Sequence, residues 1–192
     1  MGKIWCLMGK SASGKDSLYK AILAARPWLK TYVMYTTRPR REHETDGVAY
    51  HFTDRDAIDA FSANGRLIES RTYHTVHGPW TYATVDDGQI DLDCGDYLMP
   101  GTLESYGKLQ AYFGRESLVP VYVEVEDGER LIRAIRREQE ERAPRYAEVC
   151  RRFLADAEDF SEEKLLAAGI TKRYNNDNFD RCLQEILQDI VR

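Results

Sequence analysis

The feature that most constrains the fold is a glycine-rich loop between an apolar run and a helical pattern near the start of the chain. The apolar run covers residues 4–8, the loop reads Gly-Lys-Ser-Ala-Ser-Gly-Lys over residues 9–15, and apolar residues recur with helical spacing over residues 15–26. An apolar run of this length is typical of a strand that is buried on both faces. The loop matches the GxxxxGK part of the Walker A motif and lies between a strand and a helix N-terminus, as that motif requires. The sequence therefore predicts a phosphate-binding loop within an α/β fold.

The chemistry of such a loop favours ATP as its ligand. Glycines let the backbone turn several N–H groups toward one point, the helix N-terminus adds a partial positive charge, and Lys15 can reach the β- and γ-phosphates. The alternative, a glycine-rich turn that binds nothing, is disfavoured because strand, loop, lysine and helix occur together. The residues predicted to bind ATP are Gly9, Ser11, Ala12, Ser13, Gly14, Lys15, Asp16, Ser17 and, from a later loop, Asn176.

Further strand and helix patterns alternate along the chain. Strand patterns at residues 97–99 and 118–123 are each followed by a helical pattern, at residues 103–113 and 129–141. Such alternation implies right-handed crossovers and a parallel sheet with helices on both faces. We therefore expect a single domain with the P-loop NTPase three-layer fold and about five parallel strands.

Two segments depart from this alternation. Residues 36–85 contain a short strand at residues 48–52, a short helix after Thr53 and a β-like stretch over residues 67–84 with a turn near residues 77–79, which predicts an inserted α+β lobe. Residues 129–152 are dominated by charged side chains, and Pro144 interrupts their helical pattern, which predicts a hinged helical lid. The core would then comprise residues 1–35, 96–128 and 153–192. Its last part carries a polar strand pattern at residues 171–174 and a helix whose inward side chains are Leu183, Ile186, Leu187 and Ile190.

Composition excludes several classes of function. The net charge of -5 and the sequence pI of about 5.5 argue against a nucleic-acid-binding protein, which normally has a basic face. The four cysteines include no CxxC pair, so neither a zinc site nor a disulfide framework is expected. The apolar run at the start is too short for a membrane span or a signal peptide, so we expect a cytoplasmic protein with no membrane partner. A monomer and a homodimer are equally compatible with the sequence.

The segment that follows the first helix points to a family. Residues 35–52 read YTTRPRREHETDGVAYHF. Together with the glycine-rich loop, this segment resembles guanylate kinases, whose acceptor lobe opens with TTR, an arginine three residues on, and then G-x-x-Y-x-F. The resemblance covers nearly the whole chain, because the order of loop, lobe, inner strands, arginine-rich lid and asparagine-bearing loop is the same. It implies an enzyme that transfers a phosphoryl group from ATP to GMP with Mg²⁺ as cofactor and without a covalent intermediate.

The resemblance also assigns an acceptor site. It implies that Arg38 and Arg41 clamp the phosphate of the acceptor, a role that suits planar guanidinium groups. Tyr50 and Tyr82 would donate hydroxyl hydrogen bonds to the same phosphate, although plain packing is an alternative for each. Glu69 would accept hydrogen bonds from guanine N1–H and the 2-amino group, with Thr84 as a second contact to the base. Without the resemblance, a glutamate in a β-like stretch is more often a solvated side chain.

The lid would supply arginines that stabilise the transferring phosphoryl group. The candidates are Arg133, Arg136, Arg137, Arg151 and Arg152. The alternative is that they solvate a helix face and pair with neighbouring glutamates; we favour Arg137 and Arg152 as functional. The residues predicted to act in catalysis are Lys15, Arg38, Arg137 and Arg152. Asn176 matches the position that contacts the adenine of ATP in the family, but it also belongs to an asparagine-rich run that could cap the last helix.

The chain departs from the family pattern near the metal and near the base. The strand at residues 97–99 is followed by no acidic residue until Glu104, whereas guanylate kinases have acidic residues there. Asp16 stands where the Walker A motif has a serine or threonine that binds Mg²⁺. Because a carboxylate oxygen suits Mg²⁺, we predict that Asp16 is the metal-facing residue. Met34 and Tyr35 stand where guanylate kinases usually have serines before the TTR sequence. His74 and His77 are assigned no role.

Two other functions remain as alternatives. One is a kinase of the same architecture that acts on another small phosphorylated acceptor, which the altered residues near the base would allow. The other is a non-catalytic binding module of the guanylate-kinase-like type, and the intact Gly9, Gly14 and Lys15 argue against it.

Overall fold

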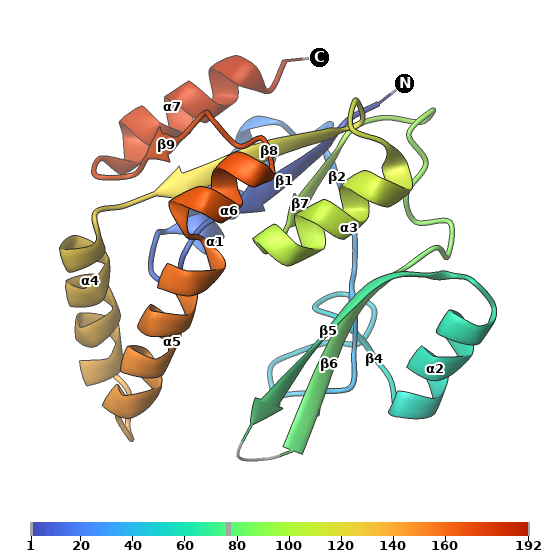
Figure 1. The fold of residues 1–192 in the computed structure, drawn as a ribbon, viewed down its shortest axis with the longest axis horizontal. Helices are drawn as coiled ribbons and strands as arrows, with labels where there is room; N and C mark the ends of the chain where they lie inside the picture. Colours follow the sequence, from blue (N-terminus) through green and yellow to red (C-terminus); the bar gives the residue numbers. More distant parts are fainter. Residues whose placement is uncertain (1, 76–77, 192) are drawn as a thin grey trace.

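The fold is organised around a parallel sheet whose strands come from both halves of the chain (Figure 1). The computed structural model describes residues 2–75 and 78–191. Within these residues the sheet has five strands in the order β2-β7-β1-β8-β9, and all neighbouring strands are parallel. The strands are β1 (Ile4–Met8), β2 (Lys30–Thr31), β7 (Tyr97–Pro100), β8 (Leu118–Glu124) and β9 (Tyr174–Asn175). The predicted α/β fold with about five parallel strands is confirmed.

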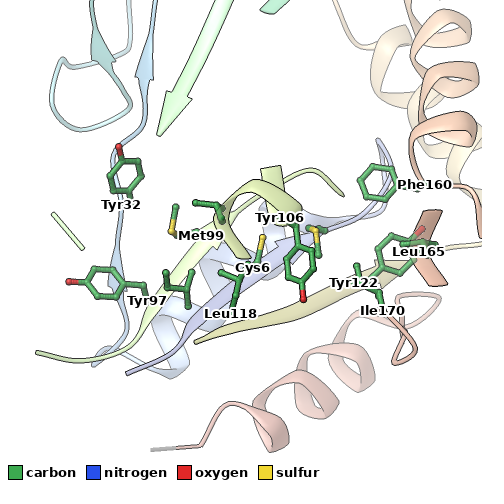
Figure 2. Packing of buried hydrophobic residues seen from close by; sticks show 13 residues of the cluster. Cys6, Tyr32, Tyr97, Met99, Tyr106, Leu118, Tyr122, Phe160, Leu165 and Ile170 are labelled. Carbon is green, nitrogen blue, oxygen red and sulfur yellow. The ribbon is translucent and has the colours of Figure 1, made fainter. Parts of the chain in front are cut away.

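Helices cover both faces of this sheet because its strands are apolar on both sides. In β1, Trp5 and Leu7 point to one face and Ile4, Cys6 and Met8 to the other, as the two-residue period of a strand requires. The first face packs against α1 (Lys15–Ala25) and α7 (Phe179–Asp189). The second packs against α3 (Leu103–Phe113) and α6 (Glu162–Ala167). Figure 2 shows this second cluster, in which the ring of Tyr122 stacks on that of Phe160 with centroids 5.6 Å apart.

The described residues also form a second, mixed sheet below the first in Figure 1. Its strand order is β4-β3-β6-β5, and the strands are β3 (Tyr35–Thr36), β4 (His51–Phe52), β5 (Leu67–Thr75) and β6 (Gly78–Val85). Helix α2 (Arg55–Ala63) begins after Asp54, whose carboxylate accepts a hydrogen bond from the Ala57 N–H. Ile58 of α2 packs on Ala83 and Val85. The turn predicted near residues 77–79 falls partly outside the described residues, since β5 ends at residue 75 and β6 begins at residue 78.

Two helices form a hairpin beside the main sheet. Helix α4 (Asp127–Gln139) and helix α5 (Tyr146–Asp159) are separated by residues 140–145, which include Pro144, so the predicted interruption is confirmed. Helix α4 begins two residues earlier than predicted because the Glu126 carboxylate caps the Glu129 N–H. The limits that the sequence gives for core, lobe and lid stay predictions. No helix among the described residues has both the length and the apolar character needed to cross a membrane.

The strand predicted at residues 171–174 is placed wrongly. The structure has β9 at Tyr174–Asn175, where it pairs with Val123 and Glu124 at the end of β8. Tyr174 is buried against the sheet, whereas residues 171 and 172 are exposed. Strand β2 and helix α6 are not predicted by the sequence, because both are short and have no clear periodic pattern.

Gly101 gives a test of how tightly α3 packs at the end of β7. A Cβ at this position would lie 2.6 Å from the Cys6 Sγ and 3.2 Å from the Ser105 Oγ. We expect Gly101→Ala to lower the free energy of unfolding by about 1–3 kcal/mol through overpacking, measured by urea denaturation. The control is Gly107→Ala within α3, where a Cβ would meet no atom within 4 Å; it should raise stability by about 0.5–1 kcal/mol. A Gly101→Ala protein as stable as the wild type would contradict this packing argument.

Candidate functional site

The glycine-rich loop between β1 and α1 has a conformation that only particular residues can adopt. Gly9 and Gly14 have φ angles of 153° and 86°, and Ala12 lies in the left-handed region at 61°. A Cβ at Gly9 would lie 2.4 Å from the Val123 carbonyl oxygen, and one at Gly14 would lie 2.4 Å from the Asn176 Nδ2. Both glycines are therefore required by close contacts as well as by backbone angles.

Lys15 folds back over this loop at the start of α1. Its Nζ donates hydrogen bonds to the carbonyl oxygens of Gly9 at 2.6 Å and of Lys10 at 3.1 Å. Burial lowers the pKa of Lys15, while the nearby carboxylates of Asp16 and Asp156 oppose that shift. The ammonium group is therefore held at the mouth of the loop with neutral carbonyl partners, which a phosphate oxygen can replace.

Asn176 supports the loop from behind. Its Nδ2 donates a hydrogen bond of 2.8 Å to the Ser13 carbonyl oxygen, and its side chain is buried. The capping predicted for the asparagine-rich run is confirmed, but the side chain that caps α7 is that of Asn178, which accepts from the Arg181 N–H, and not that of Asn176. This contact with the loop is not predicted by the sequence, and a contact of Asn176 with adenine stays a prediction.

A charged network, which the sequence analysis missed, joins the loop to the helical hairpin. The Asp156 Oδ2 on α5 accepts a hydrogen bond of 2.7 Å from the Ser11 backbone N–H. The same oxygen accepts from Arg130 at 3.1 Å, and Arg130 also donates to Asp127, which pairs with Lys10 at 3.2 Å. Arg130 is almost fully buried, so it needs both carboxylate partners. The Ser11 amide of the glycine-rich loop is therefore already hydrogen-bonded to a carboxylate oxygen of the protein, that of Asp156.

A cavity of about 580 Å³ lies between the loop, the second sheet and α5. Its lining combines residues that are far apart in the sequence, and we call it the central cavity. The predicted site residues that line it are Gly9, Ser11, Lys15, Arg41, Tyr50, Tyr82 and Arg152. The structure thus brings together the loop and the second sheet around one space. Arg137 is exposed on α4 and is not among the described residues that line this cavity.

The segment that carries Arg38 and Arg41 is held in place by Glu44. The Arg38 Nη2 donates to Glu44 Oε1 at 2.7 Å, and the Arg41 backbone N–H donates to Glu44 Oε2 at 2.9 Å. These contacts lower the pKa of Glu44 to about 2, so its carboxylate is ionised at neutral pH. Arg38 is buried, and its guanidinium lies over the ring of Tyr50, with 5.4 Å between the guanidinium carbon and the ring centroid. Arg38 therefore stands behind the wall of the central cavity, whereas Arg41 contributes to that wall.

Glu69 and Thr84 lie deeper in the second sheet than the sequence suggests. Both are buried, and the Thr84 Oγ1 donates a hydrogen bond of 2.8 Å to Glu69 Oε1. The Glu69 carboxylate also pairs with Arg71, which is the residue that lines the central cavity at this place. Arg71 was not predicted as a site residue, although side chains two residues apart on a strand point to the same face.

Two of the other lid arginines, Arg133 and Arg151, have local partners. Arg151 pairs with Glu148 three residues earlier, and Arg133 pairs with Glu129 four residues earlier. These are the helix-face pairs expected under the alternative interpretation. Arg133 also donates to the Asn176 carbonyl oxygen at 3.2 Å, so it helps to hold the loop that carries Asn176.

The candidate metal residue lies at the edge of the site. Asp16 is exposed in the first turn of α1, next to Lys15. Among the described residues no group of three or more His, Cys, Asp or Glu side chains is gathered as a metal site. Mg²⁺ commonly takes one or two carboxylates together with phosphate oxygens and water, so the single Asp16 carboxylate fits such a shared ion. Its role stays a prediction.

Comparisons with known proteins agree with this arrangement. A family model described as guanylate kinase matches residues 1–86. A guanylate kinase of Thiobacillus denitrificans is 30% identical over 190 residues, which cover 97% of this chain and 84% of the relative. A guanylate kinase of Chromobacterium violaceum is 33% identical over 93 residues, but the match covers 46% of this chain and only 44% of that relative. The chain also matches the crystal structure of guanylate kinase from Anaplasma phagocytophilum with a TM-score of 0.68 and 18% identity, over 98% of this chain and 84% of the other.

The Asp156 contact gives a test of the loop as an anion site. We expect Asp156→Asn to bind pyrophosphate roughly three- to tenfold more tightly than the wild type, because the variant removes a carboxylate that competes for the Ser11 amide at about the net free energy of one hydrogen bond. Isothermal titration calorimetry measures the change. Asp159→Asn is the control, since Asp159 lines the same cavity from the same helix and makes no hydrogen bond to the loop among the described residues. Equal pyrophosphate affinities in all three proteins would show that Asp156 does not compete.

Proposed function

Since the chain belongs to the guanylate kinase family, we propose that it transfers the γ-phosphoryl group of ATP to GMP, with ADP and GDP as products. The observation that supports this proposal is the central cavity itself. A phosphate-binding loop with Lys15 lines one side of it, and Arg41, Tyr50 and Tyr82 line the other. A phosphoryl transfer between two phosphorylated molecules requires two sets of phosphate-binding side chains that face the same cavity.

The loop at residues 9–15 would hold the donor. Its backbone amides and the N-terminus of α1 favour an anion, and Lys15 can exchange its carbonyl partners for β- and γ-phosphate oxygens. Asn176 keeps the loop in this conformation through Ser13. The Asp156 carboxylate, which bonds to the Ser11 amide, has to leave when phosphate binds, so donor binding would change how α5 is attached to the loop.

The second sheet would hold the acceptor by its phosphate. Arg41 is positioned through its own backbone bond to Glu44, and Tyr50 and Tyr82 lie edge to face with ring centroids 5.7 Å apart. Arg38 would hold Arg41 and Tyr50 in place through its contacts with Glu44 and the Tyr50 ring. Its guanidinium could bind phosphate directly if the phosphate replaced the Glu44 carboxylate. The predicted base contacts Glu69 and Thr84 pair across β5 and β6 two residues from the Arg71–Tyr82 pair, and they are not among the described residues that line the central cavity.

Transfer itself would need no covalent intermediate. The two phosphates would be held in line across the central cavity, and cations would neutralise the charge on the transferring group. Lys15 and Arg152 line the cavity and can do this directly, whereas Arg137 would require a movement of α4. Closure of the helical hairpin over the cavity would also exclude water and limit hydrolysis of ATP.

Mg²⁺ would enter with ATP and be held by Asp16 at the N-terminus of α1. When bound, the ion supplies positive charge to the phosphate oxygens of the donor. The carboxylate of Asp16 is exposed and lies beside Lys15, so it can reach an ion without any rearrangement of the core.

We expect the reaction to take place in the cytoplasm.

An acceptor panel tests the proposed activity. With ATP and Mg²⁺, ADP release should depend on GMP, and kcat/KM for GMP should exceed the values for AMP, CMP and UMP. Lys15→Met should lower kcat by roughly a hundredfold or more, the usual effect of removing a group that stabilises transition-state charge. Lys20→Met, at an exposed position of α1, is the matched control and should leave kcat unchanged. If ATP binds but none of these nucleotides, dGMP and IMP included, supports turnover, the acceptor is a different phosphorylated molecule.

The role of Asp16 is tested by titrating the metal. We expect Asp16→Ser to raise the Mg²⁺ concentration at half-maximal rate by roughly three- to tenfold, because a hydroxyl is a weaker ligand than a carboxylate for this hard cation. Asp56→Ser is the control, since Asp56 is likewise an exposed acid in the first turn of a helix but lies on α2. An unchanged Mg²⁺ requirement and turnover in Asp16→Ser would rule out a metal role for this residue.

A further inference from the structure

The wall that the second sheet contributes to the central cavity extends beyond the predicted acceptor site. On the paired strands β5 and β6, Arg71 lies opposite Tyr82, and two residues further out Tyr73 lies opposite Trp80. The two-residue period of a strand places both pairs on the same face, and all four residues line the central cavity. We call Tyr73 and Trp80 the outer aromatic pair. It lies toward the end of β5 and the start of β6, away from the main sheet (Figure 1).

Helix α5 contributes the opposite wall with a single stripe of side chains. The residues of this helix that line the cavity are spaced three and four apart, which places them on one face; they are Glu148, Arg151, Arg152, Ala155, Asp156 and Asp159. Asp156 bonds to the glycine-rich loop, and Arg152 lies one turn nearer the N-terminus of the helix, about 6 Å away along the axis. That end of α5 points away from the main sheet, on the same side as the outer aromatic pair (Figure 1). Arg152 and the outer aromatic pair therefore belong to opposite walls of the outer part of the cavity.

Arg152 differs from its neighbour Arg151 in its partners. Arg151 donates to both oxygens of the Glu148 carboxylate, at 2.8 and 2.7 Å. Arg152 makes no hydrogen bond and no ion pair with any residue that the structure describes. Burial lowers the pKa of Lys15, and the nearby charge of Arg152 lowers it further, so the two cations are close enough to repel each other. The Arg152 guanidinium is therefore a cation beside the glycine-rich loop whose N–H groups are available to a phosphate.

The Tyr73 ring is positioned by a neighbouring ring and remains half exposed. It packs edge to face on Tyr82 with centroids 5.9 Å apart, yet 47% of the residue is exposed. The face of an aromatic ring carries partial negative charge and attracts a guanidinium. Such a contact uses the flat face of the guanidinium and leaves the N–H groups at its edge free to donate to phosphate. An aromatic partner can therefore hold an arginine in place without competing with phosphate, whereas a carboxylate partner would compete.

We propose that Tyr73 and Trp80 are positioning residues for Arg152. When the hairpin of α4 and α5 closes over the central cavity, the Arg152 guanidinium stacks on the outer aromatic pair, and its N–H groups point to the transferring phosphoryl group. This inference rests on the proposed function, because it concerns how a cation reaches the reacting phosphate. The contact forms only in the closed state, so it stabilises the transition state more than it stabilises bound substrate.

Steady-state kinetics with ATP and GMP test the positioning role. Tyr73→Leu should lower kcat roughly five- to twentyfold, the usual range for a desolvated cation–π contact, and leave KM for GMP nearly unchanged. Tyr73→Phe keeps the ring and should restore most of kcat. Tyr146→Leu is the matched control, because Tyr146 on α5 is also 47% exposed but is not among the described residues that line the cavity; its kcat should equal that of the wild type.

A double-mutant cycle separates this role from simple packing. Arg152→Met should lower kcat, and the addition of Tyr73→Leu should lower it no further, because Tyr73 acts through the arginine. If Tyr73 only supports Tyr82, KM for GMP rises and the loss of kcat persists in the Arg152→Met protein. If Tyr73→Phe loses as much activity as Tyr73→Leu, the hydroxyl acts rather than the ring. Either result would overturn the inference.

The fluorescence of Trp80 gives a readout that does not depend on turnover. The wild type should shift its emission to shorter wavelength when the β,γ-imido analogue of ATP, Mg²⁺ and GMP are added, because closure shields the partly exposed indole from water. Trp80→Phe should lose the shift, which assigns it to this residue rather than to Trp5 or Trp28. Arg152→Met should bind both nucleotides in calorimetry but show no shift. Urea denaturation shows that each variant is folded at the assay temperature.

The outcomes distinguish this inference from the proposed function. A shift that needs Arg152, without turnover of any nucleotide, would support the positioning role and contradict the GMP kinase activity. GMP-dependent turnover with a shift that persists in Arg152→Met would support the activity and overturn the inference. If no shift occurs in the wild type, the contact does not form and the inference fails, whether or not GMP is phosphorylated.

Discussion

The contact on which the site depends is the close approach of two later segments to the back of the glycine-rich loop. The Val123 carbonyl lies where a side chain at Gly9 would be, and the Asn176 amide lies where a side chain at Gly14 would be. Asn176 is in turn fixed by its backbone bond to Glu124 at the end of β8, so the parallel sheet sets the shape of the loop. The direction of the loop amides is thus determined by strands that are more than a hundred residues away in sequence.

A second feature is that three arginines at or near the central cavity already have carboxylate partners. Arg38 is paired with Glu44, Arg71 with Glu69, and Arg130 with Asp127 and Asp156. In a chain with a net charge of -5, these pairs keep an anion-binding region stable before any ligand arrives. Under the proposed function, a phosphate that binds Arg38 would take the place of the Glu44 carboxylate, so its affinity would reflect the difference between the two anions. The same pairs restrict the rotamers of the arginines, which reduces the entropy lost on binding.

The fold was predictable from the sequence to the extent that it follows from local pattern. The apolar run before Gly9 and the glycines of the loop determine a strand, an anion site and a helix, and the break at Pro144 follows from the loss of a backbone donor. Hydrogen bonds between residues that are far apart in the sequence leave no such pattern. The Asp156 carboxylate accepts from the Ser11 backbone N–H, and the residues that surround each of them in the sequence give no sign of this contact. The sequence predicts helix capping or an adenine contact for Asn176, because its contact with Ser13 forms only when β9 has joined the sheet. Glu69 was assigned to the base by resemblance, and its burial behind Arg71 became visible only in three dimensions.

Helix α5 joins three parts of the molecule, since it contributes Asp156 to the loop and Arg152 to the central cavity, and leads into Phe160, which stacks on Tyr122 in the core. The helix is thus fixed at its C-terminal end, where Asp156 in its last turn bonds to the loop and Phe160 packs in the core, so it can pivot about this end. Thermodynamic linkage requires that coupling between two bound ligands be reciprocal. If donor phosphate frees this helix to move toward the acceptor, then a bound acceptor that holds the helix in its new position must tighten the donor by the same factor. The order in which the two substrates arrive would then change the path of assembly but not the stability of the ternary complex.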